Sequence, residues 1–195
     1  MIKSFKFNTI CFMNKIRLED KEFQVYIHYE TIYQSIQQIA SKINRDFKGE
    51  DTPVFLSVLN GAFMFTGDLF KELRINSYLS FVKMASYQGM NSSGEVRELI
   101  GLNEDLADRH VIVLEDIVDS GLTIRKLYEQ IQAHQPRSIS IATLLLKPDV
   151  YGESVELDYV GMEISNDFII GYGLDYNGLG RNLKDIYQVV DNGGR

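Results

Sequence analysis

The side chains best suited to chemistry gather in one short stretch, Glu-Asp-Ile-Val-Asp-Ser-Gly-Leu-Thr at residues 115–123. The apolar, mostly β-branched run at 111–114 precedes it and predicts a strand buried on both faces of a parallel sheet. Apolar residues then repeat with helical spacing from 124 to 131, which predicts an amphipathic helix. The polar residues are therefore expected at the carboxyl edge of a sheet, between a strand and a helix.

The turn at 119–123 has the composition of a phosphate site. A loop that opens a helix presents backbone N–H groups without intrahelical partners, together with the positive end of the helix dipole. Ser120 and Thr123 would add hydroxyl donors. Glu115 and Asp116 would repel a phosphate, unless they accept hydrogen bonds from vicinal sugar hydroxyls or hold a divalent cation beside the ligand. A phosphorylated sugar satisfies both requirements.

Residues 115–123 resemble the phosphoribosyl-pyrophosphate motif of the type I phosphoribosyltransferases, in which two acids, a third acid, and then Thr or Ser, Gly and Thr follow a hydrophobic run. The resemblance implies that Glu115 and Asp116 hold the ribose hydroxyls and bind Mg²⁺ directly or through water. It implies that Asp119 is the general base for the purine's ring nitrogen. The 5′-phosphate would be held by Ser120, Gly121, Leu122 and Thr123, and Asp119 is implied as a further residue of the phosphoribosyl-pyrophosphate site.

A second strand, turn and helix pattern lies at residues 54–73. Its residues 58–65 resemble the pyrophosphate-binding loop of the hypoxanthine-guanine branch of the family. That likeness implies that Leu59, Asn60 and Gly61 bind pyrophosphate. Many relatives carry Lys or Arg where Asn60 stands, so side-chain contacts are expected to be weaker there or replaced by backbone contacts.

Two further strands are predicted at 79–87 and 96–102, and the polar, glycine-bounded segment 88–94 between them has the composition of a mobile lid. Composition alone leaves a plain hairpin connection equally open. Ser86 and Tyr87 match the Ser-Tyr pair that begins the flexible catalytic loop of the family. The resemblance implies a loop that closes over the pyrophosphate and excludes water.

Lys147 ends another apolar strand, expected at 138–146. From the residues alone it is either a rim residue with a buried stem or a ligand-binding cation. It matches the family's lysine that reads the exocyclic oxygen of a 6-oxopurine. The resemblance therefore implies purine recognition.

Residues 167–176 resemble the family's hood segment. Phe168 would stack on the base, Ile169 would offer backbone groups to its edge, and Asp175 would complete the purine side of the site and ligate a second Mg²⁺. Arg181 matches a pyrophosphate-contacting arginine. The implied Mg²⁺ ligands are thus Glu115, Asp116 and Asp175.

The chain's 195 residues, of which 45% are hydrophobic, fit one α/β domain. The resemblance implies the type I phosphoribosyltransferase fold, a mainly parallel twisted sheet flanked by helices. Its core would span about residues 30–147, and a small hood subdomain would combine the N-terminal arm with about residues 148–190.

Composition restricts the partners and the compartment. The net charge of −7 argues against a nucleic-acid surface, and no apolar run reaches the roughly 20 residues that span a bilayer. Cys11 is the only cysteine, which agrees with a reducing cytoplasm. Apolar faces on the expected helices favour a homodimer or homotetramer.

These inferences converge on a purine-salvage enzyme. It would transfer the 5-phosphoribosyl group from phosphoribosyl pyrophosphate to hypoxanthine or guanine with Mg²⁺, giving IMP or GMP and pyrophosphate. A regulatory protein that senses phosphoribosyl pyrophosphate with the same fold is an alternative, as is a xanthine- or pyrimidine-preferring transferase. The sequence disfavours the sensor, because it has no basic stripe and retains Asp119 and Lys147.

Overall fold

The computed structural model describes residues 15–49, 52–86, 96–100, 105–152 and 155–190, with the backbone alone at 85–86 and 96–100. The main sheet consists of β3 (Val54–Leu59), β4 (Tyr78–Ser86), β5 (Val96–Ile100), β6 (His110–Val118), β7 (Ser138–Leu146) and β8 (Tyr159–Glu163). Its strand order is β5-β4-β3-β6-β7-β8. The β4-β3, β3-β6, β6-β7 and β7-β8 pairs are parallel, whereas β5 runs antiparallel to β4.

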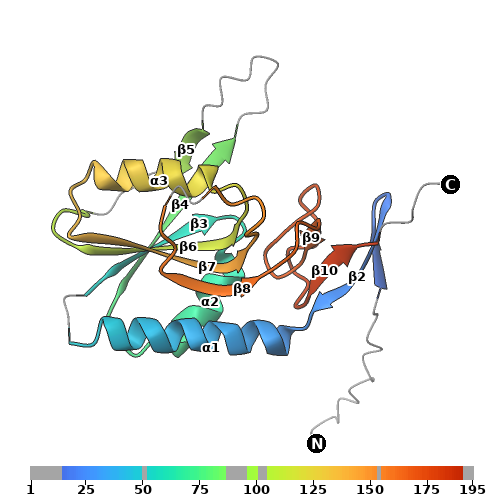
Figure 1. The fold of residues 1–195 in the computed structure, drawn as a ribbon, viewed down its shortest axis with the longest axis horizontal. Coiled ribbons are helices and arrows are strands. Elements are labelled where there is room, and N and C mark those ends of the chain that lie inside the picture. The colour runs from blue at the N-terminus through green and yellow to red at the C-terminus, as the bar shows by residue number, and fades with distance from the viewer. Residues whose placement is uncertain (1–14, 50–51, 87–95, 101–104, 153–154, 191–195) are drawn as a thin grey trace, which may run out of the picture.

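Helices cover both faces of the main sheet (Figure 1). On one face lie α1 (Tyr29–Asp46) and α2 (Phe63–Glu72), and on the other lies α3 (Leu122–Gln132). Because β3 and residues 111–114 of β6 are buried on both faces, their sequences are apolar without alternation, apart from the buried Ser57 of β3. The predicted fold, a mainly parallel sheet between helices, is confirmed.

The helix α1 shows how the pattern of apolar residues sets the packing. Ile32, Ile36, Ile39 and Ile43 recur at helical spacing, and all four are buried against the sheet and α2. The first backbone N–H of the helix, that of Tyr29, donates to Asp185 Oδ1 at 2.8 Å. No helix of the described residues is long and apolar enough to cross a membrane.

A second, antiparallel sheet forms the hood. Its strands, in spatial order, are β1 (Lys15–Leu18), β2 (Lys21–Ile27), β10 (Ile186–Val189) and β9 (Ile169–Ile170). A separate small core of Phe23, Ile170 and Tyr187 holds it together. Figure 1 shows the hood beyond the carboxyl ends of the main-sheet strands, where ligands of doubly wound sheets bind.

Two boundaries differ from expectation. β6 runs on to Val118 instead of ending at residue 114, because β7 continues beside it and pairs with these last residues. β8 pairs with β7 in the main sheet, so the hood begins after β8 rather than near residue 148. Gly161 permits this close packing, since a Cβ there would lie 2.6 Å from the Leu144 carbonyl oxygen. The N-terminal 14 residues and the proposed lid at 88–94 lie outside the described residues.

Candidate active site

Two buried acids mark the carboxyl edge of the main sheet. Leu114 is the last β6 residue that pairs with β3, and Glu115 and Asp116 follow it while β6 still pairs with β7. The two acids are only 8% and 9% exposed, respectively. Successive strand residues face opposite sides of a sheet, so the two carboxylates point in different directions from the same strand.

The environment of these acids favours their protonated forms. Burial, with a further contribution from the charge of Asp116, raises the pKa of Glu115 well above its usual range. Burial also raises the pKa of Asp116 to about 6, although backbone N–H groups and the charge of Arg181 oppose the rise. Glu115 Oε2 has no hydrogen-bond partner in the described part of the chain. A buried, unpaired carboxylate oxygen of this kind suits a sugar hydroxyl or a divalent cation.

The turn after β6 provides free backbone donors. Gly121 precedes α3 with a φ of +78°, a left-handed conformation that glycine adopts at little cost. Among the described residues no side chain caps this helix end, so its first N–H groups remain available for an anion. Ser120 and the side chain of Leu122 are exposed, and Thr123 is half-buried. The predicted turn between strand and helix is therefore present, and its role as a phosphate site stays a prediction.

Asp119 and Lys147 meet at adjacent strand ends. Asp119 follows β6 and Lys147 follows β7, and the Lys147 Nζ lies 3.5 Å from the Asp119 Oδ2. The Lys147 backbone N–H donates to the Val118 carbonyl oxygen at 3.0 Å, which fixes the base of the side chain. Lys147 is buried, whereas the Asp119 carboxylate is exposed. A cationic donor and an anionic acceptor thus stand side by side at the edge of the site.

The second predicted loop reaches the same place. The Leu59-Asn60 peptide bond is cis, and Ala62 N–H donates to the Val58 carbonyl oxygen as the chain turns into α2. At Gly61 a Cβ atom would lie 1.6 Å from Asp116 Oδ2. Only glycine lets this turn approach the acid, so the predicted pyrophosphate loop lies directly against Asp116.

A loop of the hood closes over the turn at Gly61. A Cβ at Gly173, where φ is +99°, would lie 2.1 Å from the Gly61 carbonyl oxygen. Arg181 Nη1 donates to the Gly173 carbonyl oxygen at 2.7 Å, and Arg181 Nη2 lies 2.6 Å from Asp175 Oδ1. These contacts place Arg181 and Asp175 beside the predicted pyrophosphate loop.

Asp175 has both carboxylate oxygens engaged within the described residues. Oδ1 pairs with Arg181, and Oδ2 accepts the Gly178 backbone N–H at 2.6 Å. A metal role for Asp175 would require one oxygen to be shared or released. The described carboxylates and histidines include one group of three whose ligand atoms lie within 4.8 Å of one another, His28, Glu30 and Asp185, which is a different set from the predicted acids.

The predicted base-stacking residue is available to a ligand. Phe168 is 45% exposed, and its ring lies 5.7 Å from the Tyr176 ring and 6.3 Å from the Phe23 ring, centroid to centroid. Ile169 is buried in β9. An aromatic ring that packs against other rings and is also partly exposed to solvent can stack on a flat base.

Some residues at the site escaped sequence reasoning, and others remain undescribed. Tyr172 and Gly173 lie in the predicted hood segment but were given no role, although the Gly-Tyr-Gly run at 171–173 signals close backbone packing around an aromatic residue. Ser86 ends β4, but its side chain lies outside the described residues, as does all of Tyr87.

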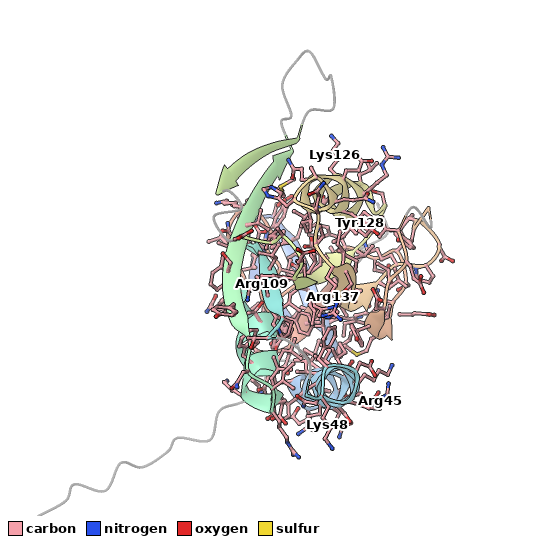
Figure 2. All side chains as sticks on the ribbon, turned by 90° about the vertical axis from the view of Figure 1, so that its left-hand side faces the viewer. Arg45, Lys48, Arg109, Lys126, Tyr128 and Arg137 are labelled. Carbon is pink, nitrogen blue, oxygen red and sulfur yellow. The ribbon has the colours of Figure 1, made fainter. Side chains whose placement is uncertain are left out.

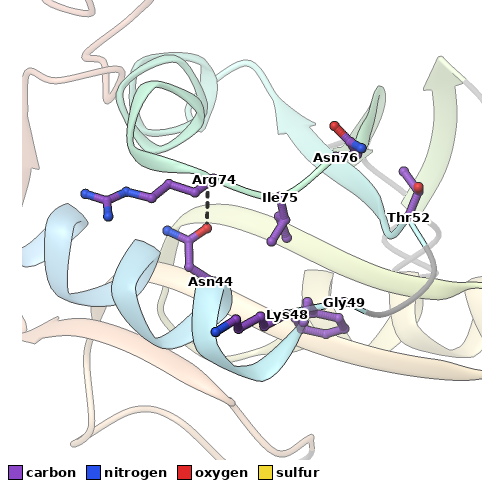
Figure 3. Close-up of a pocket in the computed structure, with 8 residues that line it drawn as sticks. Asn44, Lys48, Gly49, Thr52, Arg74, Ile75 and Asn76 are labelled. Atoms are coloured by element: carbon purple, nitrogen blue, oxygen red, sulfur yellow. Dashed lines mark hydrogen bonds between the residues drawn. The ribbon is translucent and has the colours of Figure 1, made fainter.

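The cavity drawn in Figure 3 lies away from this site. Its volume is about 500 Å³, and its lining includes Asn44, Phe47 and Ile75 where α1 and α2 end. The Asn44 amide joins the two helix ends, because its Nδ2 donates to the Glu72 carbonyl oxygen and its Oδ1 accepts the Arg74 N–H. The cavity is therefore a depression at the place where hydrogen bonds from Asn44 hold the ends of α1 and α2 together.

The end of the molecule opposite the hood carries several basic residues (Figure 2). Arg45 pairs with Asp46 at 2.9 Å. The Arg109 guanidinium lies 4.2 Å from the centre of the Tyr78 ring and donates to the Thr52 carbonyl oxygen. Two of the basic side chains at this end therefore have partners within the chain.

Replacing Asp116 by Asn is expected to stabilise the ligand-free protein at neutral pH. The native pKa of about 6 exceeds the ordinary value of 3.8, so the folded state binds the proton more tightly and stability falls as pH rises between these values. Removal of the charge should therefore add about 1–3 kcal/mol to the free energy of unfolding at about pH 8 and much less at about pH 4. Urea unfolding of the variant and the wild type at each pH measures these free energies.

The exposed Asp149 provides the control, because Asp149→Asn should change stability little at either pH. A lower stability of Asp116→Asn than of wild type at the higher pH would contradict the assignment of an unfavourable buried charge. The same variant is expected to bind phosphoribosyl pyrophosphate more weakly.

Comparison with known proteins agrees with this geometry. Residues 27–177 match the family model of the phosphoribosyl transferase domain. The hypoxanthine-guanine phosphoribosyltransferase of Mycobacterium tuberculosis is 38% identical over 169 residues, which are 83% of this chain and 83% of that protein. The hypoxanthine phosphoribosyltransferase of Escherichia coli is 34% identical over 170 residues, 86% of this chain and 95% of that one.

Solved structures show the same likeness. A hypoxanthine-guanine phosphoribosyltransferase from Bacillus anthracis superposes with a TM-score of 0.80 at 34% identity, covering 86% of this chain and 98% of that one. A hypoxanthine phosphoribosyltransferase from Trypanosoma cruzi superposes with a TM-score of 0.81 at 34% identity, covering 90% of this chain and 95% of that one. The chain is therefore a transferase that belongs to the phosphoribosyltransferase family, in its hypoxanthine-guanine branch.

Proposed function

We propose that this protein transfers the 5-phosphoribosyl group from phosphoribosyl pyrophosphate to hypoxanthine or guanine, giving IMP or GMP and pyrophosphate, as a cytoplasmic homodimer or homotetramer. The observation that carries the proposal is the contact between Lys147 Nζ and Asp119 Oδ2 at 3.5 Å. It lies next to a helix N-terminus with free backbone donors.

This pair of side chains complements one edge of a 6-oxopurine. The exocyclic O6 is an acceptor, and the N7–H beside it is a donor. The ammonium of Lys147 can donate to O6 while the carboxylate of Asp119 accepts from N7–H. Removal of the N7 proton by Asp119 makes N9 a better nucleophile toward the anomeric carbon. Phe168, exposed at the hood, would stack on the base, with Ile169 offering backbone groups to its edge.

The sugar phosphate has its own set of contacts. The N–H groups at the start of α3, with the Ser120 and Thr123 hydroxyls, would bind the 5′-phosphate. Glu115 and Asp116 would accept hydrogen bonds from the ribose hydroxyls. Their burial and the unpartnered Glu115 oxygen also suit Mg²⁺. When bound, Mg²⁺ would offset the negative charge of the pyrophosphate.

The departing pyrophosphate would lie between two loops. The backbone of Leu59, Asn60 and Gly61 would bind it from the main sheet, and Arg181 would bind it from the hood. As the anomeric C–O bond breaks, negative charge grows on the leaving oxygen, and fixed donors stabilise that charge without reorganising. Arg181 is positioned for this role by its bond to the Gly173 carbonyl oxygen.

Nucleotide formation from hypoxanthine, guanine, xanthine and a pyrimidine, each with phosphoribosyl pyrophosphate and Mg²⁺, tests the proposal. We expect turnover of hypoxanthine or guanine, and its loss when a chelator removes the metal. Preference for xanthine or the pyrimidine would support the alternative transferase. Binding of phosphoribosyl pyrophosphate without turnover of any base would support the sensor.

A further inference from the structure

A buried carboxylate joins the hood to the helix that follows the pyrophosphate loop. Asp68 lies on α2, and its Oδ2 accepts hydrogen bonds from the Tyr172 hydroxyl at 2.7 Å and from the Tyr29 hydroxyl at 3.2 Å. Its Oδ1 lies 2.7 Å from Lys71 Nζ. The cluster therefore connects three segments, namely the hood loop, the start of α1, and α2.

The charges of the cluster are well defined. Burial raises the pKa of Asp68, but hydrogen bonds from Lys71, Tyr172 and Tyr29 together outweigh it, and the pKa lies below its usual range. Burial and the bond to Asp68 raise the pKa of Tyr172 far above its usual range. At neutral pH Tyr172 therefore donates to a charged carboxylate, which makes the stronger kind of hydrogen bond.

These contacts form a closed cycle that runs from the pyrophosphate loop through α2 and the hood loop and back again. Gly61 leads directly into α2, and α2 carries Asp68. Asp68 binds Tyr172, and the next residue, Gly173, packs against the Gly61 carbonyl oxygen. Arg181 is bound to the same glycine twice, because its carbonyl oxygen accepts from Gly173 N–H at 3.0 Å and its guanidinium donates to Gly173.

We propose that Tyr172 is a positioning residue, whose hydrogen bond to Asp68 holds the hood loop at the distance from Gly61 that Arg181 needs to reach the pyrophosphate. The inference rests on the proposed function, because the roles of Gly61 and Arg181 toward pyrophosphate are part of it. Tyr172 itself is only 1% exposed, so it acts through its neighbours and touches no ligand.

The hydroxyl can be removed without leaving a buried charge unpaired. In Tyr172→Phe, Asp68 would still accept from Tyr29 and pair with Lys71. The contacts that hold the purine side are independent of it, since Val189 N–H donates to the Phe168 carbonyl oxygen and β10 pairs with β9. Loss of the hydroxyl should therefore loosen the pyrophosphate side of the site selectively.

Steady-state kinetics of Tyr172→Phe test this inference. We expect the KM for phosphoribosyl pyrophosphate to rise about 5- to 20-fold, with a smaller fall in kcat, while the KM for the purine stays within about twofold. A variant that merely lost stability would not separate the two KM values. Circular dichroism and thermal unfolding establish that the variant is folded.

Tyr159→Phe is the matched control. Tyr159 is also buried, and its hydroxyl also donates to an aspartate, Asp46 Oδ2 at 3.2 Å, but it lies on β8 and meets the far end of α1. The same chemical change there should leave both KM values near wild type. A second variant, Asp68→Asn, keeps an acceptor oxygen for Tyr172, so its KM for phosphoribosyl pyrophosphate should stay closer to wild type than that of Tyr172→Phe.

The outcomes separate the inference from the proposed function. Lack of turnover in wild type and in Tyr159→Phe would overturn the proposed function. With both active, an unchanged KM for phosphoribosyl pyrophosphate in Tyr172→Phe would overturn the inference, and so would equal rises for the two substrates. Failure of Tyr172→Phe to fold would also contradict it, because the remaining donors to Asp68 are held to be sufficient.

Discussion

Asp119→Asn is expected to lower kcat by about 10²–10⁴-fold, the range for loss of a general base. The amide cannot take a proton from the purine, but it fills the same space at an exposed position, so the fold and the phosphate turn should be unchanged. The KM for phosphoribosyl pyrophosphate should therefore change little. Single-turnover kinetics with saturating substrates measure the chemical step directly.

Asp149→Asn provides the control for this prediction. Asp149 is also exposed and lies two residues after Lys147, so the variant removes an equal charge from the same edge of the molecule. It should retain wild-type kcat. Wild-type turnover by Asp119→Asn would remove Asp119 from the chemistry, and the proton would have to go elsewhere.

Lys147→Met should abolish the preference for 6-oxopurines. In the wild type, adenine would set its amino group against the buried Lys147 ammonium, donor against donor, so the hydrogen bond that O6 accepts would be lost and no acceptor on the base would replace it. Adenine should therefore be rejected by at least about 10²-fold in kcat/KM. Met keeps the length of the stem without the charge, so kcat/KM for hypoxanthine should fall steeply while that for adenine does not.

The exposed Lys48, at the end of the molecule shown in Figure 2, supplies the control. Lys48→Met should retain both the activity and the discrimination. Efficient use of adenine by the wild type would show that Lys147 is a rim residue with a buried stem. Full discrimination in Lys147→Met would lead to the same conclusion.

Local sequence patterns predicted the parts of the site that are close in the chain. The phosphate turn is one example, because β-branched residues before it and Gly121 within it act over a few positions. The strand end at Lys147 is another. Adjacent parallel strands bring their carboxyl ends together, and the structure accordingly places Asp119 and Lys147 side by side at the ends of β6 and β7, a contact that the sequence analysis did not predict.

Contacts between distant segments were not predictable in this way. Tyr172 and Asp68 are separated by 104 positions, and nothing near either residue indicates the other. The place of β8 was also missed, because a five-residue strand satisfies either sheet and the choice depends on how it packs. β8 lies in the main sheet, where Tyr159 packs into the hydrophobic core together with the buried residues of α1.

The stacking of Gly61 between Asp116 and Gly173 has a consequence for inhibitor resistance. At both glycines an added methyl group would overlap atoms of the opposite segment, at 1.6 Å and 2.1 Å respectively. No single substitution at either position can reshape this surface while keeping the loops in contact. An inhibitor that bonds only to the backbone of Gly61 would therefore contact atoms that no tolerated substitution at Gly61 or Gly173 can change. Variants that escape such an inhibitor would have to arise elsewhere in the chain.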